Sequence, residues 1–304
     1  MKLKPQPARS PRPSRARAAV RGRGGARSRG RGARRPGVSL QRRMAGRMPS
    51  IRRVIAALGA VAAALALVAL LNGPWLRVSQ VAWAGDHFTD AAELEELLAG
   101  ERGASVLKVD TRALSERLER IPSVASAQVS ASLTGQIHAS VVEPDVAFVW
   151  ATSSARFLGA ADGTMFAVLG RDAALPSDVR TLPLITDERS VARVITVGDR
   201  LPAGLLDAAM RITEIDPAAL GSRTPELTVR IDDEFGFRLI STDPSWEVTL
   251  GVYGIDPRET TGEAIARLER QVTAVRTLFA SESETEIGWV DVRNPGKVYF
   301  RAKG

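Results

Sequence analysis

An uncharged apolar run from Val54 to Leu71 restricts the possible folds of this chain more than any other feature. If helical, a run of this length covers about 27 Å, which just spans the hydrocarbon core of a bilayer. A secretory signal peptide is the alternative, but its basic region would be 53 residues long, and Ala82-Trp83-Ala84, which looks like a cleavage site, lies well beyond the run. We therefore predict an uncleaved transmembrane helix over residues 54–74.

The charge of the 304-residue chain changes sign at this helix. Residues 1–53 hold 18 of the 42 Lys+Arg and no Asp or Glu, whereas the rest holds 24 Lys+Arg against 34 acids, a net charge of −10. Basic residues stay on the cytoplasmic side of a membrane. Arg52 and Arg53 directly precede the run, and Trp75 follows it as an expected interface anchor. We predict a cytoplasmic N-terminus and an exported region from residue 75 onward.

The basic segment, residues 1–53, is built from Arg, Gly, Pro, Ala and Ser and cannot bury a core, so we expect it to be disordered. Arg21-Gly22-Arg23-Gly24-Gly25 is similar to an RNA-binding RGG box, but no aromatic residue is interleaved with the arginines. The favoured interpretation is a solvated tail that touches anionic lipid. The acidic remainder repels phosphate, so no specific nucleic acid is expected as a partner.

Residues 75–145 predict a small α+β module of order strand, helix, helix, strand, strand. Leu76–Trp83 alternates as a half-buried strand does, and Asp90 and Asp110 are helix N-caps that precede apolar stripes. Two further alternating segments, 124–133 and 137–143, predict a hairpin with one face toward a core. His138 falls on the polar face of that hairpin and is expected to be solvated.

Four short motifs in a fixed order give this segment a family resemblance. They are Val78–Gly85, Leu107–Asp110, Leu118–Val129 and Val141–Trp150. The segment resembles the POTRA domain of the bacterial cell-division family FtsQ, called DivIB in many Gram-positive bacteria. Three places depart from the family pattern: Pro144 replaces an arginine, Leu133-Thr134 replaces Trp-Pro at the turn, and Ser130 and Ala131 replace basic residues. These changes affect surface contacts of the hairpin and leave its core pattern intact.

Residues 146–304 combine short strand patterns with two helices. Asp162-Gly163 between apolar positions predicts a hairpin turn. Helices are expected over 205–214, with Leu206, Ala209, Met210 and Thr213 toward one side, and over 261–279; strands are expected over 226–231, 235–240, 246–251 and 297–301. The resemblance extends over about residues 50–304. The prediction is an α+β chain: a disordered basic tail (1–53), a transmembrane helix (54–74), a βααββ POTRA domain (75–145) and a larger mixed α/β domain with a mostly antiparallel sheet that ends in an edge strand (146–304).

The sequence offers little for catalysis. It has no cysteine and two histidines, and no nucleophile elbow, zinc-protease motif or nucleotide-binding loop occurs. Asp232-Asp233-Glu234 and Asp162 fit local turns better than a metal or acid–base site, and we expect Trp83, Trp150, Trp246 and Trp289 in cores. No catalytic, cofactor-binding or metal-binding residue is therefore predicted. The alternative, a membrane-anchored extracytoplasmic hydrolase, needs Asp162, Asp232 or Glu234 to converge with His87 or His138.

The last expected strand supplies the predicted partner site. A strand at the edge of a sheet leaves backbone groups unpaired, and another chain can add a strand there. By resemblance to the family, whose closing region binds FtsB in complex with FtsL, this role is assigned to Lys297, Val298, Tyr299, Phe300 and Arg301. The opposing interpretation is that Tyr299 and Phe300 pack under the sheet. The resemblance further implies a non-enzymatic scaffold of the division septum, anchored in the cell membrane by one span, that links these partners to septal peptidoglycan synthesis and is recruited through its POTRA domain.

Overall fold

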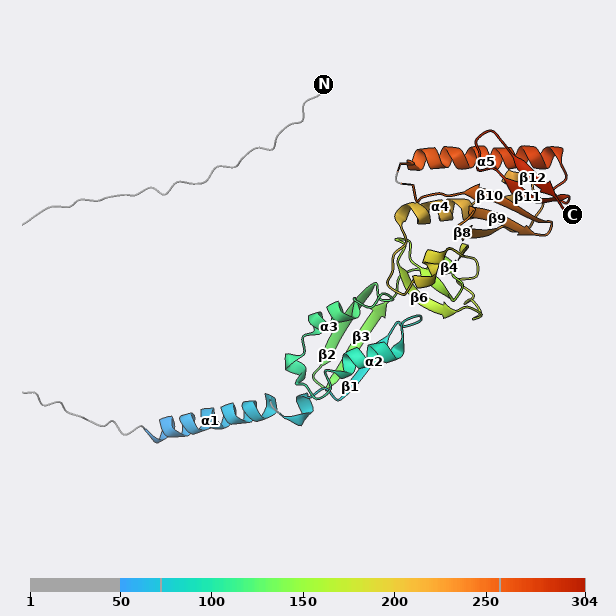
Figure 1. The fold of residues 1–304 in the computed structure, drawn as a ribbon. Coiled ribbons are helices and arrows are strands. Elements are labelled where there is room, and N and C mark those ends of the chain that lie inside the picture. Colours follow the sequence, from blue (N-terminus) through green and yellow to red (C-terminus); the bar gives the residue numbers. More distant parts are fainter. Residues whose placement is uncertain (1–49, 72, 257, 304) are drawn as a thin grey trace, which may run out of the picture. The chain divides into compact units, whose positions relative to one another are not determined.

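The computed structural model of the chain describes residues 50–71, 73–256 and 258–303 (Figure 1). Residues 1–49, which make up nearly all of the predicted basic tail, lie outside the described residues. Helix α1 runs from Ile51 to Leu71 with every side chain exposed. Within the described residues, it is the one helix long and apolar enough to cross a membrane, with a mean hydropathy of 2.8.

Helix α1 begins before the apolar run that predicted it. Arg52 and Arg53 lie in its first turn, where the backbone N–H groups of Arg53 and Val54 donate to the Ser50 carbonyl at 2.7 and 3.3 Å. Arginine has a high helix propensity, so the helix does not stop where the charge begins. Trp75 lies after the helix in a 3-10 turn, η1 (Pro74–Leu76), and is 68% exposed.

A three-stranded sheet with two helices follows α1. Its elements are β1 (Gln80–Ala84), α2 (Ala91–Ala99), η2 (Val106–Lys108), α3 (Thr111–Leu118), β2 (Ser126–Ser132) and β3 (Gln136–Val142). Strand β3 is central, parallel to β1 and antiparallel to β2. The predicted N-caps are confirmed: Asp90 accepts from the Ala92 N–H at 2.9 Å, and Asp110 accepts from the Ala113 N–H at 3.0 Å. Each bond satisfies one of the free donors at a helix start.

The core of this module follows the predicted alternation along β3. Ile137, Ala139 and Val141 are buried, whereas His138 is exposed as expected. The predicted first strand is shorter than expected, because Val78 bonds to the turn at Gly103 and Ala104 and pairing with β3 begins at Gln80. Leu133 is 66% exposed, because it lies at the hairpin turn, beyond the last paired residue of β2.

The rest of the chain is built on a nine-stranded sheet. Its strands are β4 (Phe148–Ala151), β5 (Ala155–Gly159), β6 (Met165–Gly170), β7 (Leu184–Asp187), β8 (Thr228–Asp232), β9 (Gly236–Thr242), β10 (Ser245–Gly251), β11 (Ile287–Asp291) and β12 (Tyr299–Ala302). Their spatial order is β12-β11-β10-β9-β8-β7-β4-β5-β6. Five of the eight pairings are antiparallel and three, β4 with β7, β7 with β8 and β10 with β11, are parallel. The predicted α+β class with a mostly antiparallel sheet is confirmed.

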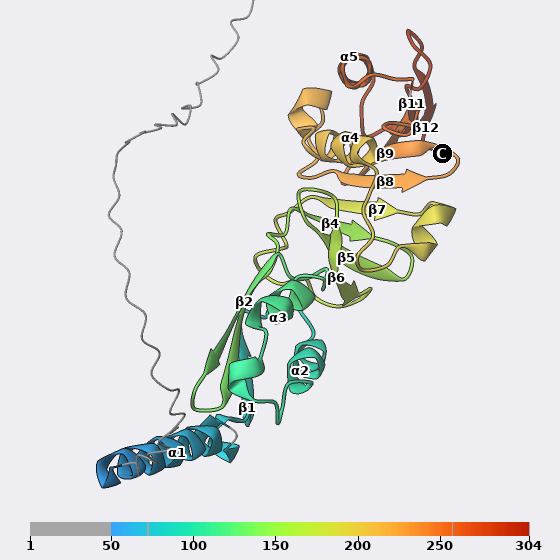
Figure 2. The same cartoon turned by 90° about the vertical axis from the view of Figure 1, so that its left-hand side faces the viewer.

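Two helices supply crossover connections and cover this sheet (Figure 2). Helix α4 (Ala203–Thr213) joins β7 to β8 and packs on both, and α5 (Thr261–Ser281) joins β10 to β11 and packs on β10. Parallel neighbours require such crossovers. Helix α5 begins with a capping box, in which Thr260 and Glu263 exchange side-chain-to-backbone hydrogen bonds. Shorter 3-10 turns are η3 (Ser190–Val194) and η4 (Pro217–Leu220).

The main core lies between these helices and the sheet. Trp150 and Trp246 are buried as predicted, whereas Trp83 and Trp289 are only partly buried. The buried face of α4 also differs from the prediction: Leu205, Leu206, Ala208, Ala209 and Ile212 are buried, and Met210 and Thr213 are not. The difference arises because Leu205 and Ile212 share one side of the helix with Ala209, and that side meets β7 and β8.

Candidate functional site

Strand β12 forms one edge of the nine-stranded sheet and, among the described residues, pairs only with β11. All of its residues are exposed, Tyr299 by 45% and Phe300 by 47%. Tyr299 lies opposite Asp291, and Phe300 lies opposite Val290, a residue of the main core. Because successive side chains alternate across a strand, the two rings project from opposite faces of the sheet. An unpaired backbone edge is thus flanked by a half-covered aromatic ring on each face.

The remaining predicted site residues surround this edge. Strand β12 begins at Tyr299, so Lys297 and Val298 lie in the connection from β11 instead of in the strand. A turn there, closed by the Lys297 N–H and the Asn294 carbonyl at 3.1 Å, leads into β12. Val298 is partly buried against the core, and the Lys297 side chain is exposed. The Arg301 guanidinium lies 6.0 Å from the centre of the Trp289 ring, so this tryptophan lines the surface beside the edge.

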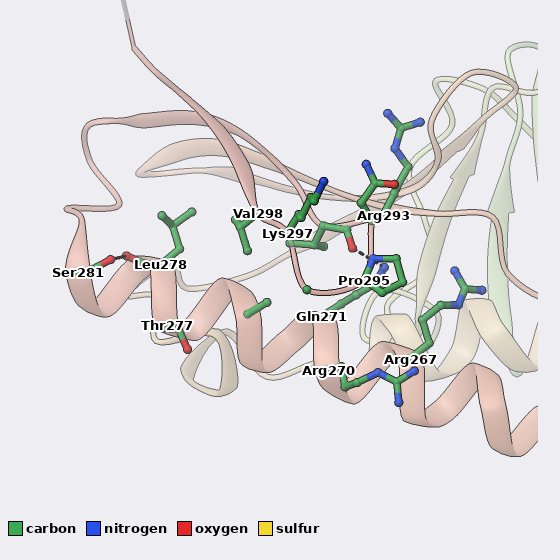
Figure 3. A pocket seen from close by; sticks show the side chains of 14 residues that line it. Arg267, Arg270, Gln271, Thr277, Leu278, Ser281, Arg293, Pro295, Lys297 and Val298 are labelled. Carbon is green, nitrogen blue, oxygen red and sulfur yellow. Dashed lines mark hydrogen bonds between the residues drawn. The ribbon is translucent and has the colours of Figure 1, made fainter.

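A groove lies next to the edge, between α5 and residues 292–298 (Figure 3). Its volume is about 400 Å³. Gln271 is buried in α5 and holds this helix to the sheet beside the groove. Its Nε2 donates to the Leu250 and Val292 carbonyls at 2.9 and 3.0 Å. Its Oε1 accepts from the Tyr253 hydroxyl. The apolar part of the lining comes from Ala274, Leu278, Val292, Pro295 and Val298.

Four basic residues and no acidic residue line this groove: Arg267, Arg270, Arg293 and Lys297. Arg267 pairs with Glu259 at 2.7 Å and stacks 3.7 Å from the centre of the Tyr253 ring, while Arg293 pairs with Asp291 at 2.7 Å. Within residues 50–71, 73–256 and 258–303, neither Arg270 nor Lys297 has an ion-pair partner. The groove therefore carries two uncompensated positive charges. Sequence reasoning missed Arg270 because it lies 27 positions before Lys297 in the chain.

Side chains of α3 cover the outer edge of β2, in contrast to the uncovered edge of β12 in the described residues. Ser115 and Glu119 of α3 reach across the edge of β2: the Ser115 hydroxyl accepts from the Val129 N–H at 3.1 Å, and the Glu119 carboxylate accepts from the Ala127 N–H at 3.2 Å. At the far edge of the nine-stranded sheet, the start of β6 is covered by a loop, since the Met165 N–H donates to the Asp199 carbonyl at 2.8 Å. Among the described residues, no comparable contact covers β12.

The acidic and histidine side chains considered for catalysis do not gather. Asp162 accepts from the backbone and hydroxyl of Thr164, both at 3.0 Å, and the hydrogen bond from the Thr164 N–H is the main cause of its lowered pKa. Asp232 accepts from the Glu234 and Phe235 N–H groups at 2.9 and 2.6 Å, as a turn residue does. None of the four described grooves is lined by Asp162, Asp232, Glu234, His87 or His138. No cluster of three potential metal ligands occurs among the described residues.

Glu143, the residue directly after β3, acts as a clamp on the loop between β1 and α2. Its carboxylate accepts from the backbone N–H groups of His87, Phe88 and Thr89 and from the Thr89 hydroxyl, at 2.6–3.1 Å. Burial raises the pKa of Glu143, but these hydrogen bonds outweigh burial and the net pKa lies below its usual 4.5. Glu143, in the motif Val141–Trp150, thus has a structural function in the module.

A comparison with family models decides what this module is. Residues 76–143 match the model described as POTRA domain, FtsQ-type. The module is an FtsQ-type POTRA domain. Behind one apolar helix, the POTRA domain fits the FtsQ/DivIB family of cell-division proteins, and it indicates protein–protein interactions in cell division. No curated protein matches the chain. Glu143 is the last residue of the match, and Pro144 lies just outside it.

Proposed function

We propose that the chain is a non-enzymatic scaffold of the bacterial division machinery that binds FtsB- and FtsL-like proteins outside the membrane. In this function it connects them to septal peptidoglycan synthesis. The observation that carries the proposal is the open edge of β12, with Tyr299 and Phe300 half exposed on its two faces.

Addition of a partner strand to β12 accounts for the unpaired backbone of this edge and for the two half-exposed rings beside it. Backbone hydrogen bonds supply affinity, and the side chains on either face supply selectivity. The exposed part of each ring can then be covered, and full burial of a side chain of this size is worth about 1.5–3 kcal/mol. Covering the remaining half of Tyr299 and Phe300 therefore contributes roughly 1 kcal/mol each. Lys297 and Arg301 flank the edge and keep it soluble when no partner is bound.

The membrane arrangement follows from α1 and the charge on either side of it. Arg52 and Arg53 in its first turn, with the basic tail before them, favour a cytoplasmic N-terminus, and the exposed Trp75 favours the opposite interface. The POTRA domain and the nine-stranded sheet then lie outside the cytoplasm at the division septum. In this arrangement the tail contacts anionic lipid, and the POTRA domain recruits the protein through other division proteins.

The hydrolase alternative lacks a supporting observation. Asp162 and Asp232 are held in local turns, and the imidazoles of His87 and His138 lie in other elements, on the β1–α2 loop and on β3. An acid–base pair must meet around a common substrate atom, and these groups line no common groove among those described.

The test is binding of the full-length chain, in detergent or nanodiscs, to a co-expressed FtsB- and FtsL-like complex. Tyr299→Glu places a charge at the edge and is expected to abolish co-purification, as is removal of residues 297–304. Val168→Glu is the matched control, since Val168 lies on the opposite edge strand, β6, and is 51% exposed. Undiminished binding by a folded Tyr299→Glu protein would refute the edge assignment.

A further inference from the structure

We propose that a second groove, between α4 and α5, binds an amphipathic helix whose apolar stripe is flanked by basic side chains. This helix belongs to a partner other than the one that adds a strand to β12. The inference goes beyond the proposed function and does not depend on it, because it concerns a different surface of the protein.

The groove lies between two helices that cover the same face of the nine-stranded sheet and share one core (Figure 2). Its volume is about 340 Å³. Each helix lines it with a stripe of residues, which are Gly204, Asp207, Ala208 and Arg211 of α4 and Thr261, Ala264, Ile265 and Leu268 of α5. Both stripes extend over two helical turns, so the groove follows the helices for about 10 Å. A partner helix can place apolar anchors at positions i, i+3 or i+4, and i+7 over that length.

Much of the lining is apolar and open to solvent. Ala264, Ile265 and Leu268 of α5 are only partly buried, and Ile255, at the rim, is 52% exposed. Contiguous exposed apolar surface of this kind is typical of a protein interaction site. An apolar stripe of a partner helix would cover these side chains.

The floor of the groove is fixed in the free protein. Tyr253 is buried, and its hydroxyl donates to Oε1 of Gln271. Gly254 has a φ of +69° and lies so close to α4 that a Cβ added to it would overlap the Gly204 carbonyl. A groove that is already formed binds a partner without the cost of rearrangement.

The charged side chains of the groove favour a basic occupant. Three acidic residues line it, Asp207, Asp256 and Glu259, against one basic residue, Arg211. Arg211 pairs with Asp207 at 2.9 Å, and Arg267 pairs with Glu259 at 2.7 Å. Asp256 is exposed and has no ion-pair partner among the described residues. A basic side chain of a partner therefore meets a free carboxylate there, whereas an acidic side chain is repelled.

The two grooves beside α5 differ in charge and use different sides of this helix. The groove next to β12 is lined by basic and no acidic residues, whereas the groove next to α4 has one arginine against three acids, a net charge of −2. At 3.6 residues per turn, Ala264 and Leu268 project from another side of α5 than Arg270 and Ala274. A charged segment that is attracted to one groove is repelled by the other, so the groove next to α4 requires its own partner.

Two synthetic helical peptides with the same leucine stripe serve as probes, one flanked by lysines and the other by glutamates. Fluorescence anisotropy measures their binding to the full-length chain in phosphatidylcholine nanodiscs, with empty nanodiscs as the reference. The lysine peptide is expected to bind about tenfold more tightly than the glutamate peptide, and Ile255→Ser with Asp256→Lys is expected to remove about that tenfold advantage. Val252→Ser with Asp172→Lys is the matched control, because Val252 is also 52% exposed, Asp172 is exposed, and neither lines the groove.

The outcomes separate this inference from the proposed function. Equal binding of the two peptides, or unchanged binding of the lysine peptide to a folded groove variant, overturns the inference. Tyr299→Glu should bind the lysine peptide as the unmodified chain does, and the groove variant should retain the FtsB- and FtsL-like complex. If the groove variant instead loses that complex, the groove belongs to the strand-adding partner and the inference is wrong. If the unmodified chain sediments as a dimer and the groove variant as a monomer, the occupant is a second copy, and the inference is likewise wrong.

Discussion

Two sheet edges of this protein differ in whether their unpaired backbone groups are covered. One is β2 of the POTRA domain, and the other is β12 of the nine-stranded sheet. At β2, side chains of α3 accept hydrogen bonds from the outward N–H groups of Ala127 and Val129. At β12, two half-exposed aromatic rings flank an edge that nothing covers in the described structure. An uncovered edge invites strand addition, so proteins usually close or charge it. The difference supports the proposal that β12 is the edge to which a partner adds a strand.

The largest expected effect concerns the open edge. Tyr299→Ala with Phe300→Ala is expected to weaken binding to the FtsB- and FtsL-like complex about 100-fold, because truncation of two aromatic anchors commonly costs more than 1 kcal/mol each. The measurement is a titration of the full-length chain by biolayer interferometry. Since both rings are only half covered in the free protein, its thermal unfolding should change little. A large drop in the unfolding temperature would mean that the rings serve the sheet and not a partner.

The next effect concerns the POTRA domain and the clamp that Glu143 forms on the loop between β1 and α2. Glu143→Gln removes the negative charge that holds three backbone N–H groups and the Thr89 hydroxyl, and is expected to destabilise the domain by about 2 kcal/mol. Hydrogen–deuterium exchange of peptides from residues 80–142 measures the loss. Glu101→Gln, at another glutamate of the domain for which no backbone contact of the side chain is described, is the control and should leave exchange unchanged.

The clamp also predicts a dependence on pH. The pKa of Glu143 is lowered in the folded domain, so its carboxylate stabilises the fold above its unfolded value near 4.5, and this stabilisation is lost as the pH falls through the folded pKa. Exchange in residues 80–142 should therefore increase below pH 4.5. Glu143→Gln should show a smaller increase, and an identical acid response of both proteins would contradict the assignment.

Much of this fold follows from local sequence signals. Asp90 and Asp110 start their helices because a carboxylate satisfies free N–H groups there, and Ile137, Ala139 and Val141 are buried because their alternation matches the pleat of a strand. Such signals need only neighbouring residues, so one sequence reveals them. The motifs from Val78 to Trp150 were sufficient to identify the family that the POTRA match supports.

The features that could not be predicted from the sequence depend on residues far apart in the chain. Arg270 and Lys297 line the same groove because α5 joins β10 to β11, and no local pattern in the sequence indicates that. Trp289 was expected in a core, but its place on β11 opposite Arg301 leaves it partly exposed. Ser115 and Glu119 carry ordinary helix-surface patterns, and their function in closing β2 appears only once α3 lies beside that strand.

A smaller effect tests the closed edge. Ser115→Ala with Glu119→Ala leaves the N–H groups of Ala127 and Val129 without partners and is expected to cost about 1–2 kcal/mol in the stability of the POTRA domain. Ser115→Thr with Glu119→Gln retains an acceptor at each position and serves as the control. Because the edge is then open, self-association at high concentration should appear in analytical ultracentrifugation of the alanine variant. A monomeric alanine variant of unchanged stability would show that α3 does not close this edge.

The smallest effect separates the two faces of β12. Arg301 lies over the Trp289 ring on the face that carries Tyr299, and such an exposed cation–π contact contributes about 0.5 kcal/mol. Arg301→Ala should therefore lower the stability of the nine-stranded sheet only slightly, whereas Arg301→Lys should retain most of the contact, and urea denaturation of the full-length chain measures both. Arg301 is not one of the two aromatic anchors, so Arg301→Ala should weaken partner binding much less than Tyr299→Ala with Phe300→Ala. Equal losses of binding would show that Arg301 is itself a main contact of the partner.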